Sequence, residues 1–317
     1  MRSLTSQVVA GGFLIWTVSC SSAEQGETAV ADTTDLMAAQ AVDSVAQRAQ
    51  ELGVEVVGQG VISTSGNQTF PAEDPTDGSL WYSVYDDDFA GQTIMVAQQT
   101  NSGWAPPAVA SFSGTHGDRA PRFSPDGRYL YFTSNRPRTT DGTSDDMNIW
   151  RVARSNGTWS EPEPLGDPVN SDGQDIHASV TNSAIWVASN RAGTMGRSDI
   201  YRVGLGNNML GDAEHLPAPL NDANSQPDIW VSPDETWMIL AITDHPDGFG
   251  GDDLFISRVE DGSWTAPVNL GAGINSPEYE YGPTMSRDGQ YILFTSHRAG
   301  SANVYRVPVS SVSSDAS

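Results

Sequence analysis

The chain of 317 residues contains no lysine, so all 16 of its basic residues are arginines, against 40 aspartates and glutamates. The formal net charge is therefore 16 − 40 = −24. Nucleic-acid binding depends on basic side chains that neutralise phosphates, and this charge argues against it. Anionic membrane surfaces attract basic segments and are disfavoured for the same reason. We expect a monomer whose partners are basic or neutral surfaces, or sugars.

Cysteine is almost absent, because Cys20 is the only one. A single thiol excludes an intrachain disulfide bond and a cysteine-built zinc cluster. The apolar run from Val8 to Val18 follows Met1-Arg2. It is too short for a membrane span of ~20 residues, but it has the length of the apolar part of a signal peptide. We therefore expect the protein to be exported.

The apolar run ends in Thr17-Val18-Ser19-Cys20, which resembles the lipobox of bacterial lipoproteins, although Thr17 stands where leucine is usual. The resemblance implies that Cys20 becomes the lipidated first residue of the mature protein. The lipid would then be the only membrane contact, on the periplasmic or cell-surface side of the outer membrane. A plain secretory signal that is cleaved nearby is the alternative.

The sequence predicts four regions. Residues 1–20 are the signal peptide, residues 21–53 a tether and helix, residues 54–310 a repeat domain, and residues 311–317 a serine-rich tail. Between Asp35 and Leu52 the apolar residues recur every three or four positions, which predicts one helix. Gly53 suits the end of that helix.

An internal repeat fills the region beyond about Val54. One unit contains Ser124-Pro-Asp-Gly127, then Tyr129 to Arg136, then Asn148 to Val152. The same order returns near the end of the chain, in Ser286-Arg-Asp-Gly289, Tyr291 to Arg298 and Asn303 to Val307. Three further copies are centred on turns near residues 78, 182 and 235, which gives a period near 50 residues. A period of this length with several short strands is typical of a propeller blade.

These units resemble the TolB-type β-propeller repeat, which is similar to the Trp-Asp repeat and has a Ser-Pro-Asp-Gly turn and Ser-x-Arg and Asp-Ile-Tyr elements. The resemblance covers roughly residues 66–309. It implies an all-β propeller of four-stranded antiparallel blades in the bacterial envelope. TolB-like propellers act as interaction scaffolds in the periplasm, but only residues 21–53 precede the ring, so we do not carry over the Tol-system role.

We count five units and favour five blades, with six as the alternative. The last unit stops after its third strand, at Tyr305-Arg-Val307. The strand-like segment from Val54 to Ile62 can supply the missing fourth strand and close the ring. Closure matters because an open propeller would leave unpaired strand edges.

We call the face where the innermost strands begin the upper face, and the face with the Asp-Gly turns the lower face. Loops at one mouth of a propeller channel are the usual binding site, so the upper face is the candidate. Alignment of the units predicts binding residues at the upper ends of the innermost strands: Asp118, Asp175, His177, Asp228 and Glu280. Converging carboxylates would bind a cation or a basic side chain. The favoured alternative is that each acid accepts hydrogen bonds from the preceding loop as a repeated structural feature, and that His177 is structural.

Arginines recur after the second strand of three units, and acids recur at or near the start of the third strand, which predicts ion pairs within blades. The arginines are Arg136, Arg191 and Arg298, and the acids are Asp146, Asp199 and Asp253. The fourth unit has Asp244 in place of the arginine. Its acids Asp244, Asp247, Asp252 and Asp253 are weak candidates for a Ca²⁺ site; no other cofactor is expected.

Tryptophans that precede a proline, namely Trp104, Trp159 and Trp264, indicate packing between blades. Trp230 is placed near an upper strand end, where it could stack on a sugar, although core packing is favoured. No G-x-S-x-G, H-E-x-x-H, P-loop or dinucleotide motif is present. We therefore expect a non-enzymatic propeller that binds an envelope protein or polysaccharide through its upper face. A carbohydrate-active enzyme that uses carboxylates at the channel mouth is the alternative.

Overall fold

The computed structural model describes residues 44–85, 91–139, 146–206 and 209–313. The chain divides into two units, residues 1–39 and 40–317, and all the described residues belong to the second. The expected signal peptide, Cys20, the tether and the first half of the expected helix lie outside the described residues. No described helix is long and apolar enough to cross a membrane.

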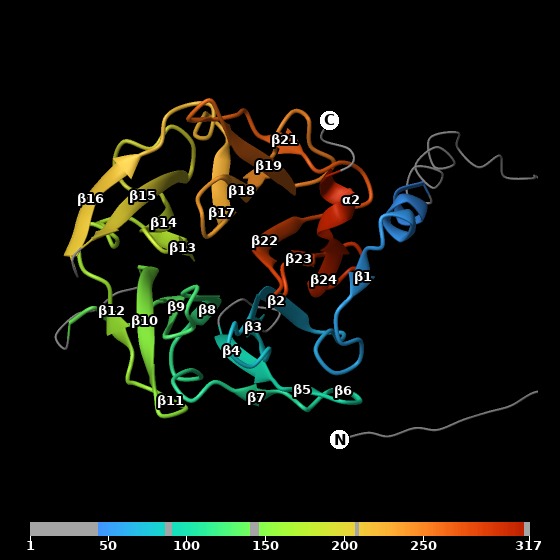
Figure 1. Cartoon of the computed structure of the whole chain (residues 1–317), viewed down its shortest axis with the longest axis horizontal. Coiled ribbons are helices and arrows are strands. Elements are labelled where there is room, and N and C mark those ends of the chain that lie inside the picture. Colours follow the sequence, from blue (N-terminus) through green and yellow to red (C-terminus); the bar gives the residue numbers. More distant parts are fainter. Residues whose placement is uncertain (1–43, 86–90, 140–145, 207–208, 314–317) are drawn as a thin grey trace, which may run out of the picture. The chain divides into compact units, whose positions relative to one another are not determined.

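The described residues form five antiparallel blades, each built on four strands from the channel to the rim, and a separate two-stranded sheet at the rim of blade 1 (Figure 1). Blade 1 contains β2 (Asn67–Glu73), β3 (Leu80–Tyr85), β4 (Gln92–Ala97) and β7 (Ala108–Val109). Blade 2 contains β8 (Asp118–Phe123), β9 (Tyr129–Ser134), β10 (Asn148–Ser155) and β12 (Glu163–Pro164). Blade 3 contains β13 (Asp175–Val180), β14 (Ala184–Ser189), β15 (Asp199–Gly206) and β16 (Met209–His215).

Blade 4 contains β17 (Ser225–Val231), β18 (Trp237–Thr243), β19 (Asp252–Glu260) and β21 (Val268–Asn269). Blade 5 contains β22 (Glu280–Met285), β23 (Tyr291–Ser296), β24 (Asn303–Pro308) and β1 (Glu55–Val56). The short strands β5 (Gln99–Thr100), β6 (Gly103–Trp104), β11 (Thr158–Trp159) and β20 (Ser263–Trp264) extend the rims of blades 1, 2 and 4. The innermost strands contact one another in the cyclic order β2, β8, β13, β17, β22 and back to β2, so the prediction of five blades is confirmed.

The ring is closed by the first and last strands of the fold. Strand β1 pairs antiparallel with β24, with Glu55 opposite Arg306 and Val56 opposite Tyr305. The amide of Val57 extends the pairing by donating to the carbonyl oxygen of Val304 at 2.8 Å. The predicted closure by the segment after Val54 is therefore confirmed, and it leaves blade 5 with four strands like the others.

Local sequence fixes the hairpin at the lower end of each innermost strand, as blade 2 shows. The hydroxyl oxygen of Ser124 accepts from the amide of Tyr129 at 3.0 Å, and the carboxylate of Asp126 accepts from the amide of Arg128 at 3.0 Å. Gly127 has a φ of 68°, in the left-handed region that glycine adopts without strain. The Ser-Pro-Asp-Gly sequence therefore closes the hairpin with its own polar side chains.

Five apolar clusters make up the core, one between each pair of neighbouring blades. Between blades 1 and 2, Trp159 packs edge-on against Trp81 with ring centroids 5.7 Å apart. Between blades 3 and 4, Trp264 packs in the same way against Trp186 at 5.9 Å. The prediction that these repeated tryptophans pack between blades is confirmed. No sheet buries both faces alone, so the ring is stable only as a whole.

Two short helical segments pack at blades 4 and 5. Residues 44–51 are helical, and Gly53 follows them with a φ of 73°, as predicted for the helix end. Leu52 is buried in the cluster between blades 4 and 5 together with Val312 of α2 (Val309–Ser313). The sequence did not predict α2, because its residues Val-Ser-Ser-Val-Ser have low helix propensity. Packing of Val312 supplies the stabilisation that propensity does not.

Candidate functional site

Three of the predicted upper-face acids are held inside their own blades by arginines. Each acid is fully buried and starts an innermost strand, and each arginine follows the second strand of the same blade. The pairs are Asp118–Arg136, Asp175–Arg191 (2.7 Å between Oδ1 and Nη2) and Glu280–Arg298 (3.5 Å between Oε1 and Nη2). Burial raises the pKa of Asp118 and of Glu280, and the arginine in each pair opposes the rise.

The same three acids also accept hydrogen bonds from a serine in the loop that precedes the blade. The donors are Ser113 to Asp118 (2.8 Å), the amide of Ser171 to Asp175 (2.7 Å) and the amide and hydroxyl of Ser276 to Glu280 (2.7 Å each). In all three blades the acid therefore makes the same two kinds of contact, with an arginine and with a loop serine. These contacts support the interpretation of the acids as a repeated structural feature. Their predicted role in binding a ligand stays a prediction.

The sequence was right about Arg–carboxylate pairs within blades but wrong about which acids take part. Pairing of β8 with β9 sets Asp118 opposite Ser134, two residues before Arg136, so the innermost strand supplies the acid. The acids at the third strand have other partners. Asp199 contacts His215 (2.7 Å), Asp253 accepts from the amides of Phe249 (2.9 Å) and Gly250 (3.1 Å), and Asp146 accepts from Gln174 (2.9 Å).

Blade 4 replaces the repeated ion pair altogether. Gln226 stands at the acid position and Asp244 at the arginine position. The amide group of Gln226 donates to Asp222, which occupies the place of the loop serine, at 3.1 Å. The donor and the acceptor have therefore exchanged places: in blade 4 the loop carries the accepting acid and the strand carries the donor. Asp244 is exposed on the upper face.

His177 and Asp228 lie two positions further along their strands and are buried. The amide of Ile229 donates to Nδ1 of His177 at 3.2 Å, which places the imidazole proton on Nε2. Burial, with Arg122 and Arg119 nearby, lowers the pKa of His177 well below its usual value, so the ring is neutral. Asp228 accepts from the amide of Gly282 at 3.3 Å. Burial, and secondarily the charge of Asp252, raises the pKa of Asp228 to about 7.

A cavity of about 260 Å³ opens at the upper end of the channel beside Asp228. Its wall includes Arg119, Asp252, Tyr85 and Tyr281. The hydroxyl groups of Tyr85 and Tyr281 are 3.1 Å apart. Burial raises the pKa of Asp252, so the cavity holds two carboxyl groups that bind protons more tightly than usual.

A second cavity of about 440 Å³ adjoins the first and shares Ile176, Pro227 and Asp252 with it. Its rim carries Arg197, Asp244 and Tyr279. Tyr279 is 47% exposed, which is high for a large aromatic side chain beside a cavity. We call the two cavities together the upper mouth. It combines an exposed aromatic ring with carboxylate and guanidinium groups.

The sequence analysis missed Arg119 and Tyr281, which occupy equivalent positions one residue after the predicted acids. Successive side chains of a regular strand point to opposite faces of the sheet, so a residue directly after the acid is expected on the face opposite to the acid. In the structure the pairing shifts between Arg119 and Arg122 and between Tyr281 and Thr284, and Ala120 at the shift has a φ of 52°. This β-bulge re-aims the following side chains. The sequence offers no repeated signal there, because the equivalent residues of blades 3 and 4 are Ile176 and Pro227.

Trp230 lies at the other end of the channel from the place that the sequence predicted. It lines a cavity together with the Ser232-Pro233-Asp234 turn, at the lower face. Its ring packs edge-on against Trp237 with centroids 4.7 Å apart. A strand of seven residues from Ser225 spans the whole channel, so a residue near its end belongs to the lower mouth. Stacking on a ligand at the upper face is therefore excluded for Trp230.

The candidate calcium ligands do not gather in the described part of the chain, where no group of three or more histidines, cysteines and acids is placed to hold a metal ion. Asp244 and Asp247 are exposed, and Asp253 is buried. The carboxylate of Asp253 instead caps the amides of Phe249 and Gly250, which organises the loop before β19.

No known family model matches this chain, and neither does any curated protein. A solved structure described as a glycoside hydrolase is similar over 84% of this chain and 94% of its own, with 12% identity and a TM-score of 0.53. The α-L-arabinofuranosidase from Lactobacillus brevis covers 82% of this chain and 93% of its own, with 14% identity and a TM-score of 0.49. A TolB candidate from Agrobacterium tumefaciens covers 78% and 79%, with 16% identity and a TM-score of 0.47. At these identities the likeness concerns the fold alone, which is a β-propeller.

Proposed function

We propose that this chain is an exported, TolB-like propeller, anchored to the outer membrane through a lipid on Cys20, that binds an envelope polysaccharide at its upper mouth without cleaving it. The lipid anchor rests on the lipobox-like segment before Cys20, and the export on the signal-like run before it. An envelope protein is the other partner class that the sequence allows.

One observation carries the polysaccharide proposal, namely the exposed ring of Tyr279 at the larger of two adjoining cavities, whose walls combine apolar surface with charged side chains. A sugar ring offers an apolar face and many hydroxyl groups, so it is complementary to an aromatic side chain flanked by charged hydrogen-bonding groups. Arg197 supplies donors at this rim, and Asp244 and Asp252 supply acceptors. The net charge of −24 favours a neutral polymer over an acidic one.

A glycoside-cleaving enzyme remains the second candidate because Asp228 and Asp252 face the same cavity of about 260 Å³. Cleavage of a glycosidic bond uses two carboxyl groups, one of them with a raised pKa as general acid. Burial raises the pKa of both groups here, to about 7 for Asp228. Against this candidate, Asp228 is only 6% exposed and its Oδ2 accepts a backbone hydrogen bond.

The two candidates are separated by offering the full chain a panel of neutral bacterial polysaccharides and measuring both retention and new reducing ends. The proposal predicts retention without new reducing ends, and a loss of retention in Tyr279→Ala. Arg128→Ala, a change of an exposed residue on the lower face, is the matched control and should bind like wild type. New reducing ends that disappear in Asp252→Asn would establish the enzyme instead.

A further inference from the structure

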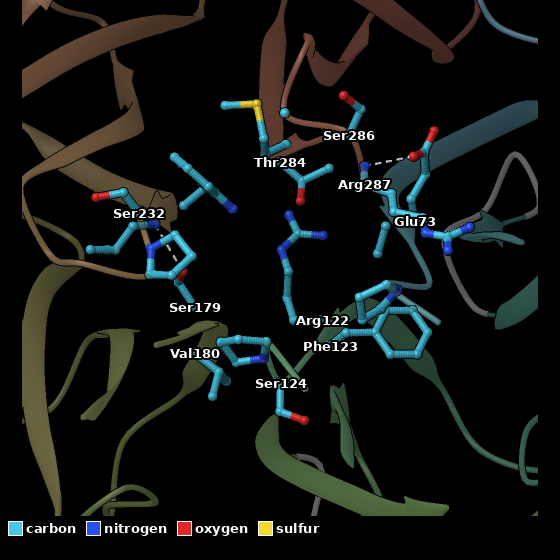
Figure 2. A pocket seen from close by; sticks show the side chains of 18 of the residues that line it. Glu73, Arg122, Phe123, Ser124, Ser179, Val180, Ser232, Thr284, Ser286 and Arg287 are labelled. Carbon is cyan, nitrogen blue, oxygen red and sulfur yellow. Dashed lines mark hydrogen bonds between the residues drawn. The ribbon is translucent and has the colours of Figure 1, made fainter. Parts of the chain in front are cut away.

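The lower end of the channel holds a separate cavity of about 550 Å³ (Figure 2). Each blade contributes one residue of its innermost strand, and the five residues occupy equivalent positions in the repeat. The position lies four residues after the repeated acid, for example Arg122 after Asp118. The five residues are Ala72, Arg122, Ser179, Trp230 and Thr284. We call this cavity the lower funnel. It is distinct from the upper mouth, with which it shares no lining residue.

Arg122 crosses the middle of the lower funnel and is 3% exposed (Figure 2). Its guanidinium donates to the carbonyl oxygens of Pro71 and Pro121 at 2.9 Å and of Pro283 at 3.1 Å. A guanidinium has five N–H donors, and its Nε has no hydrogen-bond partner within the described residues. The three carbonyl groups are neutral, and the carboxyl group of Asp228 is the charge that opposes the guanidinium. Burial raises the pKa of Asp228 to about 7, so this compensation is partial near neutral pH and Arg122 keeps a net positive charge beside the funnel.

Two hydroxyl groups line the same funnel. Thr284 contributes one from blade 5, and Figure 2 shows its side chain next to the end of Arg122. Ser179 contributes the other from blade 3; its oxygen accepts from the amide of Val231 at 2.9 Å, which leaves its own O–H to donate. The funnel is therefore lined by one positive charge and two hydroxyl groups, a combination that suits an anion.

The walls and rim of the funnel restrict which anion fits. Trp230 and Trp237 form an aromatic wall, and Met285 and Phe123 add apolar surface. At the rim, the carboxylate of Glu73 accepts from the backbone amide of Arg287 at 2.8 Å. Glu73 and Asp234 line the funnel, and so does Arg287. Arg287 offsets one of these two negative charges, and the single positive charge of the buried guanidinium matches a ligand with one negative charge.

We propose that the lower funnel binds a single carboxylate carried on an apolar or aromatic stem. Arg122, Thr284 and Ser179 hold the carboxylate, and Trp230 and Trp237 pack against the stem. Such a group occurs in small organic acids and at the C-terminal residue of a peptide chain. The same contacts serve both sources, and their relative affinity tells them apart.

The test is calorimetric titration of the full chain with 3-phenylpropionate and with the tripeptide Gly-Gly-Phe, each compared with its amide. We expect both acids to bind at least about tenfold more tightly than their amides, because the charge-assisted hydrogen bonds are lost in the amide. Tighter binding of the tripeptide identifies a peptide C-terminus as the ligand, and tighter binding of 3-phenylpropionate identifies a small acid. Equal binding of acids and amides, or no binding of either acid, overturns the proposal.

Variants locate the binding. Thr284→Val keeps the shape of the side chain and removes the hydroxyl, so it should weaken acid binding about fivefold, leave the amide unaffected and keep the melting temperature. Arg122→Gln should abolish the preference for the acid, provided its circular dichroism shows a folded ring. Arg128→Gln, the same substitution at an exposed arginine that does not line the funnel, is the matched control and should bind as wild type does. Wild-type affinity in both Thr284→Val and folded Arg122→Gln would place the binding elsewhere.

Discussion

Arg122 in blade 2 donates a hydrogen bond across the channel to the carbonyl oxygen of Pro283 in blade 5, at 3.1 Å. The same guanidinium reaches Pro71 in blade 1 at 2.9 Å. This side chain thus connects blade 2 with blades 1 and 5, which are neighbours in the ring. Blade 5 contains the pair of β1 and β24 that closes the ring. This bridge adds a contact through the axis to the strand pairing at the rim.

Replacement of Arg122 by leucine should destabilise the ring. Three buried carbonyl oxygens would lose their donor, and the expected loss in free energy of unfolding is about 3 kcal/mol. Urea denaturation of the full chain measures it. Arg128→Leu is the control, because Arg128 is an exposed arginine with one acidic partner, and it should leave the midpoint unchanged. Equal midpoints for Arg122→Leu and wild type would mean that the bridge has no role in stability.

The repeated ion pairs should matter far more than ion pairs on the surface. Asp175→Asn leaves the guanidinium of Arg191 without its acid in a site where Arg191 is only 12% exposed, and we expect a loss of about 3 kcal/mol. Asp167→Asn breaks the pair with Arg138, in which the acid is 82% exposed, and should change the midpoint little. Thermal denaturation of the two variants under the same conditions makes the comparison. If Asp167→Asn lowered the melting temperature more than Asp175→Asn does, the buried pair would not be the more stabilising of the two.

The stability of the ring should depend on pH through Asp228. Its pKa of about 7 in the folded chain exceeds the value of ~3.9 for an unfolded aspartate, so the folded state favours the protonated form. The stability contributed by protonation is complete below about pH 4 and is lost as the pH rises to about 7. The free energy of unfolding of wild type, minus that of Asp228→Asn, should therefore fall by a few kcal/mol between pH 4 and 7 and stay level above. Urea titrations at four pH values test this, and a difference that rises with pH would contradict it.

Cys20 should carry the membrane anchor. In Cys20→Ser the protein should move from the membrane fraction to the soluble fraction and lose incorporation of radiolabelled palmitate, because the thiol that takes the lipid is gone. Ser21→Ala, at the neighbouring position, should behave like wild type. Membrane retention and labelling that persist in Cys20→Ser would show that another segment holds the protein at the membrane.

The sequence predicted the architecture well because the blades repeat. The recurring Ser-Pro-Asp-Gly turn and the strand after Val54 were enough to predict five blades and the closing pair of β1 and β24. The repeat also predicted an arginine paired with an acid in blades 2, 3 and 5, but not which acid. That choice depends on strand register, which sets Asp118 opposite Ser134 and thereby beside Arg136.

The site itself was less predictable. Strict alternation along the innermost strands pointed to Asp228 and His177, whereas a β-bulge after Arg119 brings Arg119 and Tyr281 to the same cavity as Asp228. The bulge cannot be read from the strand pattern, because Ala120 at its left-handed position is not a residue that marks such a conformation. The lower funnel was missed because Arg122 looks like an ordinary strand residue until five strands meet around it.

The most direct test of the upper mouth as a polysaccharide site is photo-crosslinking in intact cells, with a photoreactive amino acid at position 279. The control position is 209, where Met209 is 71% exposed on the outer strand β16 of blade 3. The account predicts glycan adducts at position 279 and none at position 209, after recovery under denaturing conditions and mass spectrometry. Adducts at position 279 that contain only protein, or no adduct there at all, would contradict it.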